Sequence, residues 1–128
     1  MLLDHLSDRT LGYALHTNRE LGLMLRGLKP LAVFAEVYGH FPDVVRRYLR
    51  MFDRHVERGA LLKCEFVEVP QHLHVIMYAT LGEEWRIEEM LSLRQNVGEW
   101  TDEHERTEGK LLGYTDLENE IWLSRRAS

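Results

Sequence analysis

Histidine is the side chain in this sequence best suited to acid–base chemistry, and seven histidines occur in 128 residues. His72 and His74 lie two positions apart, so on a β-strand both side chains would point to one face. His104 and Glu108 lie one helical turn apart, a spacing at which a carboxylate can orient an imidazole as a base. If the chain is an enzyme, we expect His74, His104 and Glu108 to be its catalytic residues, with Tyr78 as a further proton donor.

A metal ion would use the same histidines. His72 and His74 could share an ion, but the nearby sequence supplies no third ligand. His104 lies among acidic residues in a stretch typical of a solvated helix face. The sequence therefore predicts no metal site. It also predicts no cofactor, because it contains neither a phosphate-cradling glycine loop nor a dinucleotide fingerprint.

A row of arginines is the second pattern that indicates function. The arginines recur mostly at intervals of four within a segment of helical apolar spacing, so they should share one helix face. Such a face can hold a phosphate or a carboxylate, or dock on an acidic protein surface. The alternative is an ordinary solvated face whose arginines pair with the local acids Asp43, Asp53 and Glu57. This arginine row consists of Arg46, Arg47, Arg50, Arg54 and Arg58.

The second half of the chain is acidic and could supply the counter-charge. Residues 1–70 hold ten Lys and Arg against nine Asp and Glu, whereas residues 71–128 hold six against twelve. This asymmetry predicts pairing between the two halves, within one molecule or between two copies. Trp100 lies in the acidic part on a polar stretch, so we expect it to be partly exposed and to join the arginine row in binding a partner.

Composition excludes several classes of protein. A net charge of −5 without a basic tail argues against nucleic-acid binding. No apolar run approaches the roughly 18 residues of a membrane span, so we expect no membrane partner. Cys64 is the single cysteine and the N-terminus lacks the basic start of a secretory signal. We therefore expect a cytoplasmic protein.

Apolar spacing also indicates the elements that must position these residues. Residues 17–28 favour a helix with Thr17 as its capping residue. Leu21, Leu23 and Leu25 also alternate as they would in a strand, and both interpretations stay open. Residues 31–37 form a short apolar run that is typical of a buried strand. The first element is thus ambiguous and the second is a predicted strand.

In the rest of the chain the apolar spacing assigns helices and strands more clearly. Residues 42–59 have the apolar stripe of an amphipathic helix that should lie across a sheet. Residues 62–67 and 73–79 predict a β-hairpin whose second arm is apolar enough to be a central strand. Three helices should then follow, beginning near Gly82, Thr101 and Thr115, and the last of them should bury Leu117, Ile121 and Trp122.

Together these elements predict one α+β domain spanning residues 1–128. Its small, mostly antiparallel sheet of three to four strands should pack against helices in the order αβαββααα. The first functional hypothesis is a binding or regulatory module that contacts a protein partner or a second copy through the arginine row and the acidic C-terminal helices. The alternative is a small enzyme or ligand-binding protein, with a small molecule held in an aromatic-lined pocket between the sheet and those helices.

Overall fold

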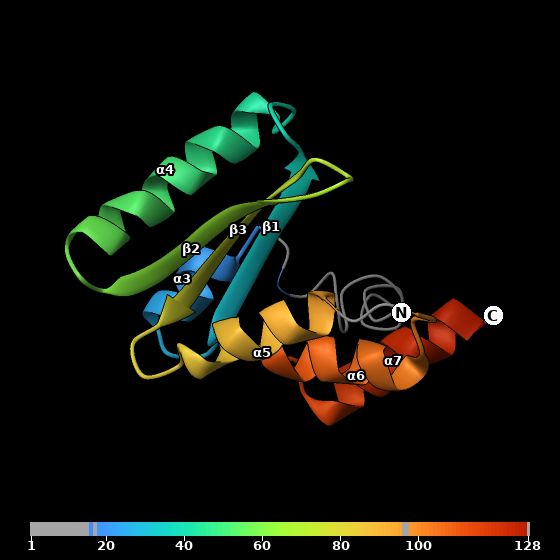
Figure 1. Ribbon diagram of the computed structural model, residues 1–128. Coiled ribbons are helices and arrows are strands. Elements are labelled where there is room, and N and C mark those ends of the chain that lie inside the picture. The colour runs from blue at the N-terminus through green and yellow to red at the C-terminus, as the bar shows by residue number, and fades with distance from the viewer. Residues whose placement is uncertain (1–15, 17, 96–97, 128) are drawn as a thin grey trace.

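The computed structural model describes residue 16, residues 18–95 and residues 98–127. Within these residues the chain forms five helices and three strands in the predicted order, which confirms the α+β class. Figure 1 shows the elements: α3 (Glu20–Leu25), β1 (Leu31–Val37), α4 (Asp43–Glu57), β2 (Leu61–Glu68), β3 (Leu73–Thr80), α5 (Trp85–Arg94), α6 (Asp102–Leu111) and α7 (Asp116–Ala127).

The three strands form one antiparallel sheet in the order β1-β3-β2. The central position of β3 confirms the prediction made from its apolar sequence. Because β1 and β2 both run antiparallel to β3, they run parallel to each other. Helix α4 connects them, so β3 is inserted into a β-α-β unit that the sequence did not reveal.

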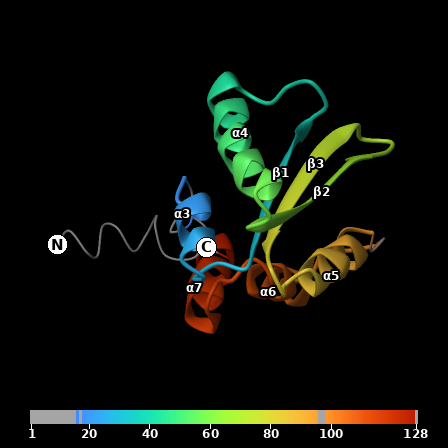
Figure 2. The same cartoon turned by 90° about the vertical axis from the view of Figure 1, so that its left-hand side faces the viewer.

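Helices cover both faces of the sheet, as the two views in Figures 1 and 2 show. Side chains alternate along β3, so Ile76 and Tyr78 face α3 and α4 and belong to one core cluster. Val75 and Met77 face the other way and pack with α5 and α6 in a second cluster. Each face of the sheet therefore has its own apolar layer.

Helix α4 is the amphipathic helix that the sequence predicts. Leu49 and Phe52 are buried against the sheet, and Val45 and Val56 pack beside them. All members of the arginine row are exposed. The apolar stripe therefore fixes α4 on the sheet and turns the guanidinium groups toward solvent.

Two predicted helix starts are confirmed by their caps. The hydroxyl of Thr101 accepts a hydrogen bond from the backbone N–H of His104 at the start of α6. At the start of α7, the N–H of Glu118 donates to the Thr115 hydroxyl and the Glu118 carboxylate accepts from the Thr115 N–H. These reciprocal bonds satisfy backbone donors that have no partner inside the helix.

At α3 and at the start of α7, the structure differs in detail from the sequence pattern. The ambiguous segment forms the short helix α3, and the predicted capping residue Thr17 lies outside the described residues. The sequence pattern placed Leu117 in the core, and this prediction is wrong, because Leu117 is 68% exposed. Glu118 and Asn119 are buried in its place. The cap at Thr115 and the contact of Asn119 with α6 turn this part of the helix inward.

In the part of the chain that the structure describes, no helix combines the length and the apolar character needed to cross a membrane.

Candidate functional site

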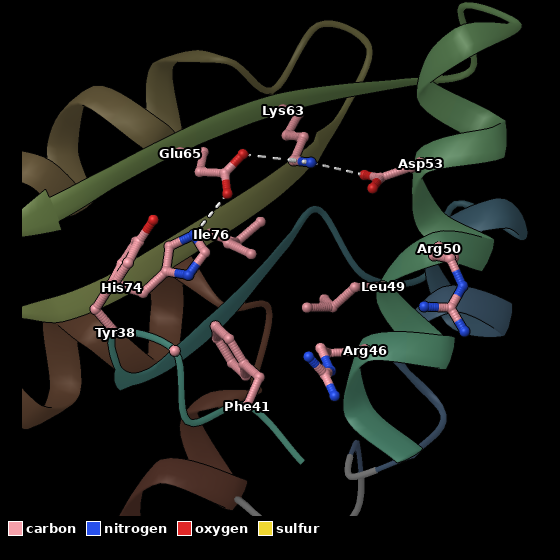
Figure 3. A pocket seen from close by; sticks show the side chains of 11 residues that line it. Tyr38, Phe41, Arg46, Leu49, Arg50, Asp53, Lys63, Glu65, His74 and Ile76 are labelled. Atoms are coloured by element: carbon pink, nitrogen blue, oxygen red, sulfur yellow. Dashed lines mark hydrogen bonds and ion pairs between the residues drawn. The ribbon is translucent and has the colours of Figure 1, made fainter. Parts of the chain in front are cut away.

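A cleft of about 370 Å³ opens between α4 and the sheet. Figure 3 shows that its walls come from α4 with the connection that precedes it, and from the strands β2 and β3. The sheet contributes two charged residues of β2 and two residues of β3, α4 contributes one side, and the β1–α4 connection contributes aromatic rings. The cleft is lined by Tyr38, Gly39, Phe41, Arg46, Leu49, Arg50, Asp53, Lys63, Glu65, His74 and Ile76.

The polar character of the cleft follows from the alternation along β2. Cys64 and Phe66 pack in the core beneath α5, so Lys63 and Glu65 point to the opposite face of the sheet. At this place the sheet borders the cleft, and 44% of the Glu65 side chain stays exposed. Charged residues on an internal face of the sheet therefore remain accessible to a ligand.

His74 and Glu65 form the closest polar pair in the cleft. Nε2 of His74 lies 2.5 Å from Oε2 of Glu65. The register pairs Val67 with His74, so Glu65 is the diagonal neighbour of the histidine on the adjacent strand. Among the described residues the imidazole of His74 has no other hydrogen-bond partner, so its Nδ1 makes no hydrogen bond there.

Two aromatic rings hold the imidazole from the side of the β1–α4 connection. The ring centroids of Tyr38 and Phe41 lie 5.4 Å and 5.3 Å from that of His74. With 19% of its side chain exposed, His74 is packed yet still reachable. The rings also add apolar surface next to the charged groups, a combination typical of ligand sites.

A chain of polar contacts leads from Glu65 across the cleft to α4. Glu65 lies 3.5 Å from Nζ of Lys63, which lies 2.9 Å from Asp53. Burial alone lowers the pKa of Lys63, but the hydrogen bond and charge of Asp53, together with Glu65, raise it above its ordinary value. Lys63 is therefore a firmly charged ammonium that is already neutralised by two carboxylates.

Tyr78, expected as a proton donor, is fully buried beneath this network. Its hydroxyl donates to Asp53 at 2.8 Å. Burial and this bond raise the pKa of Tyr78. The phenol is thus committed to holding Asp53 and is not among the residues that line the cleft.

The arginine row borders the cleft. Arg46 and Arg50 line it, and in Figure 3 they extend from successive turns of α4. Arg46 pairs with Asp43, and Nε of Arg58 donates to Nδ1 of His55 at 2.8 Å. The other three arginines, Arg47, Arg50 and Arg54, make no ion pair with any described residue.

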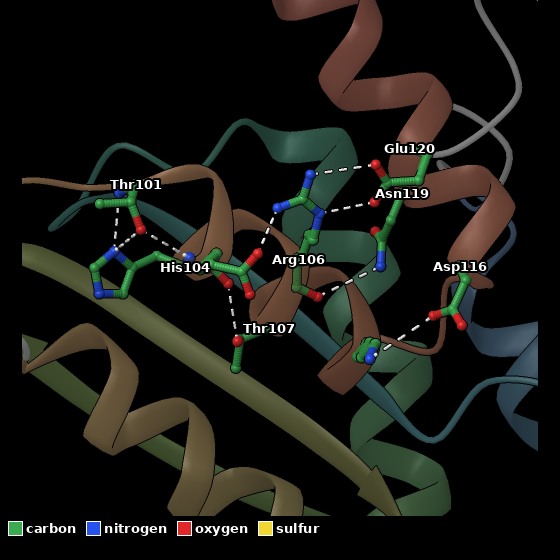
Figure 4. A network of polar contacts seen from close by, with 9 residues as sticks. Thr101, His104, Arg106, Thr107, Asp116, Asn119 and Glu120 are labelled. Carbon is green, nitrogen blue, oxygen red and sulfur yellow. Dashed lines mark hydrogen bonds and ion pairs between the residues drawn. The ribbon is translucent and has the colours of Figure 1, made fainter.

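His104 and Glu108 do not join His74. They lie on α6, which packs on the face of the sheet that carries Val75 and Met77, whereas His74 faces α4. Nδ1 of His104 accepts a hydrogen bond from the Thr101 backbone N–H and so helps to cap α6 (Figure 4). The expected cluster of three catalytic residues is therefore divided by the sheet, and the cleft lies on the face opposite to the expected pocket.

The basic residues of α6 pair with acids of α6 and α7. Arg106 hydrogen-bonds Glu120 at 2.8 Å and Glu103 at 2.5 Å, which raises the pKa of the guanidinium (Figure 4). Between residues 18 and 95 and residues 98 and 127, no ion pair joins the arginine row to α6 or α7. The two halves do pair in this described part, where Arg94 binds Glu68 at 2.7 Å, but there the basic residue belongs to the acidic half of the chain.

Trp100 also lies away from the arginine row. Its side chain is 40% exposed, as predicted. The indole N–H donates to Glu105, and the ring stacks on His104 with centroids 5.2 Å apart. The residues expected to bind a partner are therefore distributed over two surfaces, α4 with the cleft and the start of α6.

Sequence reasoning missed Glu65, Lys63 and Asp53 as site residues. The hairpin was predicted, but the register that places Glu65 diagonal to His74 depends on the length of its turn. Asp53 was interpreted as a local partner for the arginine row, whereas it turns toward the sheet and contacts Lys63. The available signal was the charged alternate positions of β2, which an otherwise buried hairpin arm would not carry.

Within the described ranges, no three His, Cys, Asp or Glu side chains come close enough together to hold a metal ion. The polar groups of the cleft are the guanidinium groups of Arg46 and Arg50 and the paired side chains of Lys63, Asp53, Glu65 and His74. Comparison of the chain with models of protein families, with curated proteins and with solved structures yields no match.

Proposed function

We propose that this chain is a small binding module that takes up an acidic protein segment on the arginine row and in the adjoining cleft. The proposal rests on Arg46 and Arg50, which belong to two surfaces at once. Both belong to the exposed row of α4, and both line the cleft. A segment lying along α4 would therefore place a side chain between α4 and the sheet.

The charge that is free to bind lies on the arginines. Lys63 is neutralised by Asp53 and Glu65, whereas Arg47, Arg50 and Arg54 have no ion-pair partner among the described residues. A guanidinium group binds carboxylates through two parallel hydrogen bonds, which suits an acidic peptide. From Arg46 to Arg58 the row extends about 18 Å along the helix axis, enough for several residues of an extended chain.

The cleft supplies the affinity and the selectivity that surface charge alone does not. Exposed ion pairs contribute at most about 1 kcal/mol each, so a row of arginines would bind acids weakly and without selectivity. Phe41, Leu49 and Ile76 offer an apolar wall beside Arg46 and Arg50. An apolar or aromatic side chain of the partner, buried there next to an acidic one, would anchor the complex.

Fluorescence anisotropy with a labelled polyglutamate peptide that contains one central phenylalanine tests this proposal. We expect the wild-type chain to bind at low salt and more weakly at high salt. Arg50→Glu combined with Arg54→Glu should weaken binding by about tenfold or more, since each lost charged contact is worth about 1 kcal/mol. Arg19→Glu combined with Arg26→Glu is the matched control, because both residues are exposed on or beside α3 and the net charge changes equally. Equal loss in both variants, or no binding by the wild type, would contradict the proposal.

A second candidate function is acid–base chemistry or small-molecule binding in the same cleft. The contact between His74 and Glu65 favours it, because a carboxylate that holds Nε2–H leaves Nδ1 as the proton acceptor. Arg46 and Arg50 would hold an anionic group of the small molecule, and Phe41 would contact its apolar part. His74 is then the residue that would accept the proton, and Glu65 is the positioning residue.

Phenyl phosphate is a suitable probe for this candidate, because it combines an aromatic ring with an anion. In NMR spectra of the histidine rings, we expect the probe to shift the signals of His74 at millimolar concentration and to leave those of His104 unchanged. His74→Gln should remove the responding signals and His104→Gln should not. Perturbation of both rings alike, or of neither, would exclude a specific site at His74.

A further inference from the structure

A buried lysine lies outside the cleft, where the chain passes from α3 into β1. Lys29 is only 2% exposed, which is rare for an ammonium group. Its Nζ lies 2.9 Å from Nδ1 of His16 and 2.5 Å from the carbonyl oxygen of Leu112, which follows α6. Nζ also lies 5.0 Å from the ring centroid of Tyr114, and that ring stacks on His16 at 4.0 Å.

Lys29 has no carboxylate in contact with it among the described residues. Burial lowers the pKa of Lys29 to about 8, and the more distant charges of Glu20 and Glu118 compensate only in part. Burial and the charge of Lys29 also lower the pKa of His16 to about 4, so His16 is a neutral acceptor near pH 7. A useful fraction of the lysine is therefore an uncharged amine in mildly alkaline solution.

Lys29 is one of the residues that line a cavity of about 340 Å³ beside β1. Its lining includes Lys29, His16 and Tyr114, together with the consecutive residues of β1 from Ala32 to Glu36. Phe41 lines both this cavity and the cleft, so the two spaces are neighbours. The volume is sufficient for a small organic molecule.

We propose that Lys29 is a nucleophilic lysine that forms a Schiff base with a small carbonyl compound bound in this cavity. The lone pair of Nζ attacks the carbonyl carbon, and a proton passes from nitrogen to oxygen to give a carbinolamine. The hydroxyl group then takes up a proton and leaves as water while the C=N bond forms and nitrogen loses its remaining proton. The balance is one amine and one carbonyl compound giving one imine and one water, with no oxidant or reductant.

The charges around the cavity favour an uncharged aldehyde or ketone. Glu20 and Glu36 are among the lining residues, and Lys29 and His16 are the basic ones. With His16 neutral, the two acids would repel an anionic keto acid, and the uncharged amine that acts as the nucleophile would not attract it. A purely structural role is the competing explanation, because an ammonium group bound to the Leu112 carbonyl also stabilises the end of α6.

Reductive trapping on the wild-type protein separates these roles. The chain contains three lysines, so Lys63 and Lys110 are internal controls in every sample. Lys63 is ion-paired, and the side chain of Lys110 is 64% exposed. The folded protein would be treated briefly with propanal and cyanoborohydride near pH 8, digested, and mapped by mass spectrometry.

We expect Lys29 to be alkylated at least about tenfold more than Lys63 or Lys110 in the folded protein, and equally with them after denaturation. Pyruvate in place of propanal should give less adduct at Lys29. Preferential alkylation of Lys110, or alkylation of Lys29 only after unfolding, would overturn the proposal and leave the structural role. An equal yield with pyruvate would overturn the assignment to uncharged carbonyl compounds. The arginine variants used to test peptide binding leave Lys29 intact, so the two proposals can fail independently.

Discussion

At the scale of single residues, the surroundings of a side chain decide its chemistry more than its type does. Lys63 and Lys29 are both partly or fully withdrawn from water, yet contact with Asp53 raises the pKa of Lys63, whereas burial without a carboxylate in contact lowers that of Lys29. The first lysine is locked in an ion-pair network and the second is a reactive amine. The same contrast separates His74, which Glu65 orients in the cleft, from His104, which caps a helix.

The lowered pKa of Lys29 predicts a characteristic pH dependence of stability. Because the group binds its proton more weakly in the folded state than in the unfolded state, the penalty for burying the charge is complete below pH 8 and disappears as pH rises toward 10.5. Wild-type stability relative to Lys29→Met should therefore rise across this window, by at most about 1.4 kcal/mol per pH unit. Urea unfolding of both proteins at several pH values measures it, and a constant difference would show that Lys29 ionises normally.

At the scale of elements, neighbouring helices complete each other's ends. Helix α3 has no side-chain cap from its own N-terminal residue, and the backbone N–H of Leu21 donates to the Tyr48 hydroxyl of α4 at 2.9 Å instead. That hydroxyl donates in turn to Glu20 at 3.2 Å. A residue from another helix thus satisfies a donor that the first turn of α3 leaves free.

Tyr48→Phe should therefore destabilise the protein more than Tyr78→Phe. The first change leaves the Leu21 N–H without its acceptor in a part-buried place, which costs about 1–3 kcal/mol. The second removes a donor to Asp53, which keeps its contact with Lys63, and should cost about 1 kcal/mol. Chemical denaturation followed by circular dichroism compares the two, and the reverse order would show that Tyr48 does not cap α3.

Two glycine substitutions should have opposite effects on stability, because Gly109 lies where α7 packs on α6 and Gly22 lies in open space. A Cβ on Gly109 would lie 1.8 Å from Oδ1 of Asn119, so Gly109→Ala must displace a buried side chain and should cost about 1–3 kcal/mol. Gly22→Ala in α3 meets nothing within 4 Å and should stabilise its helix by about 0.5–1 kcal/mol. Melting temperatures should move in opposite directions, and an increase for both would show that α6 and α7 pack less closely.

At the scale of the whole molecule, one thin sheet is shared by two layers of helices. The three tryptophans, at positions 85, 100 and 122, lie in the C-terminal part beyond the sheet, whereas Phe52 packs on the opposite face. If the chain unfolds as one domain, a destabilising substitution on the α4 face must shift the unfolding transition that the tryptophans on the other face detect. This coupling gives a direct test of the single-domain expectation.

Phe52→Leu should lower the free energy of unfolding by about 1–3 kcal/mol, because it removes volume from a closely packed aromatic cluster with Tyr78. Tryptophan fluorescence and far-ultraviolet circular dichroism should then shift to the same lower denaturant midpoint. Arg54→Leu, a change on the exposed side of α4, serves as the control and should leave the midpoint almost unchanged. A fluorescence transition that stays in place while the circular dichroism signal shifts would indicate two separately folding parts.

Features that depend on neighbours in the chain were open to prediction from the sequence. The stripe of Leu49 and Phe52 identified α4, the apolar run of residues 73–79 identified the central strand, and Thr101 and Thr115 marked two helix starts. These elements can be predicted from the sequence because helical periodicity, strand periodicity and capping each depend on residues only a few positions apart.

The sequence alone determined the class of fold, the order of its elements and the exposed arginine row, since each follows from short-range spacing. Only the tertiary structure decided that β3 lies between β1 and β2, that Glu65 rather than Glu108 meets His74, and that Lys29 is buried without a carboxylate in contact. The physical reason is that strand register, the choice of sheet face and burial depend on contacts between residues far apart in the chain, and these are settled only when the apolar faces of all elements pack together.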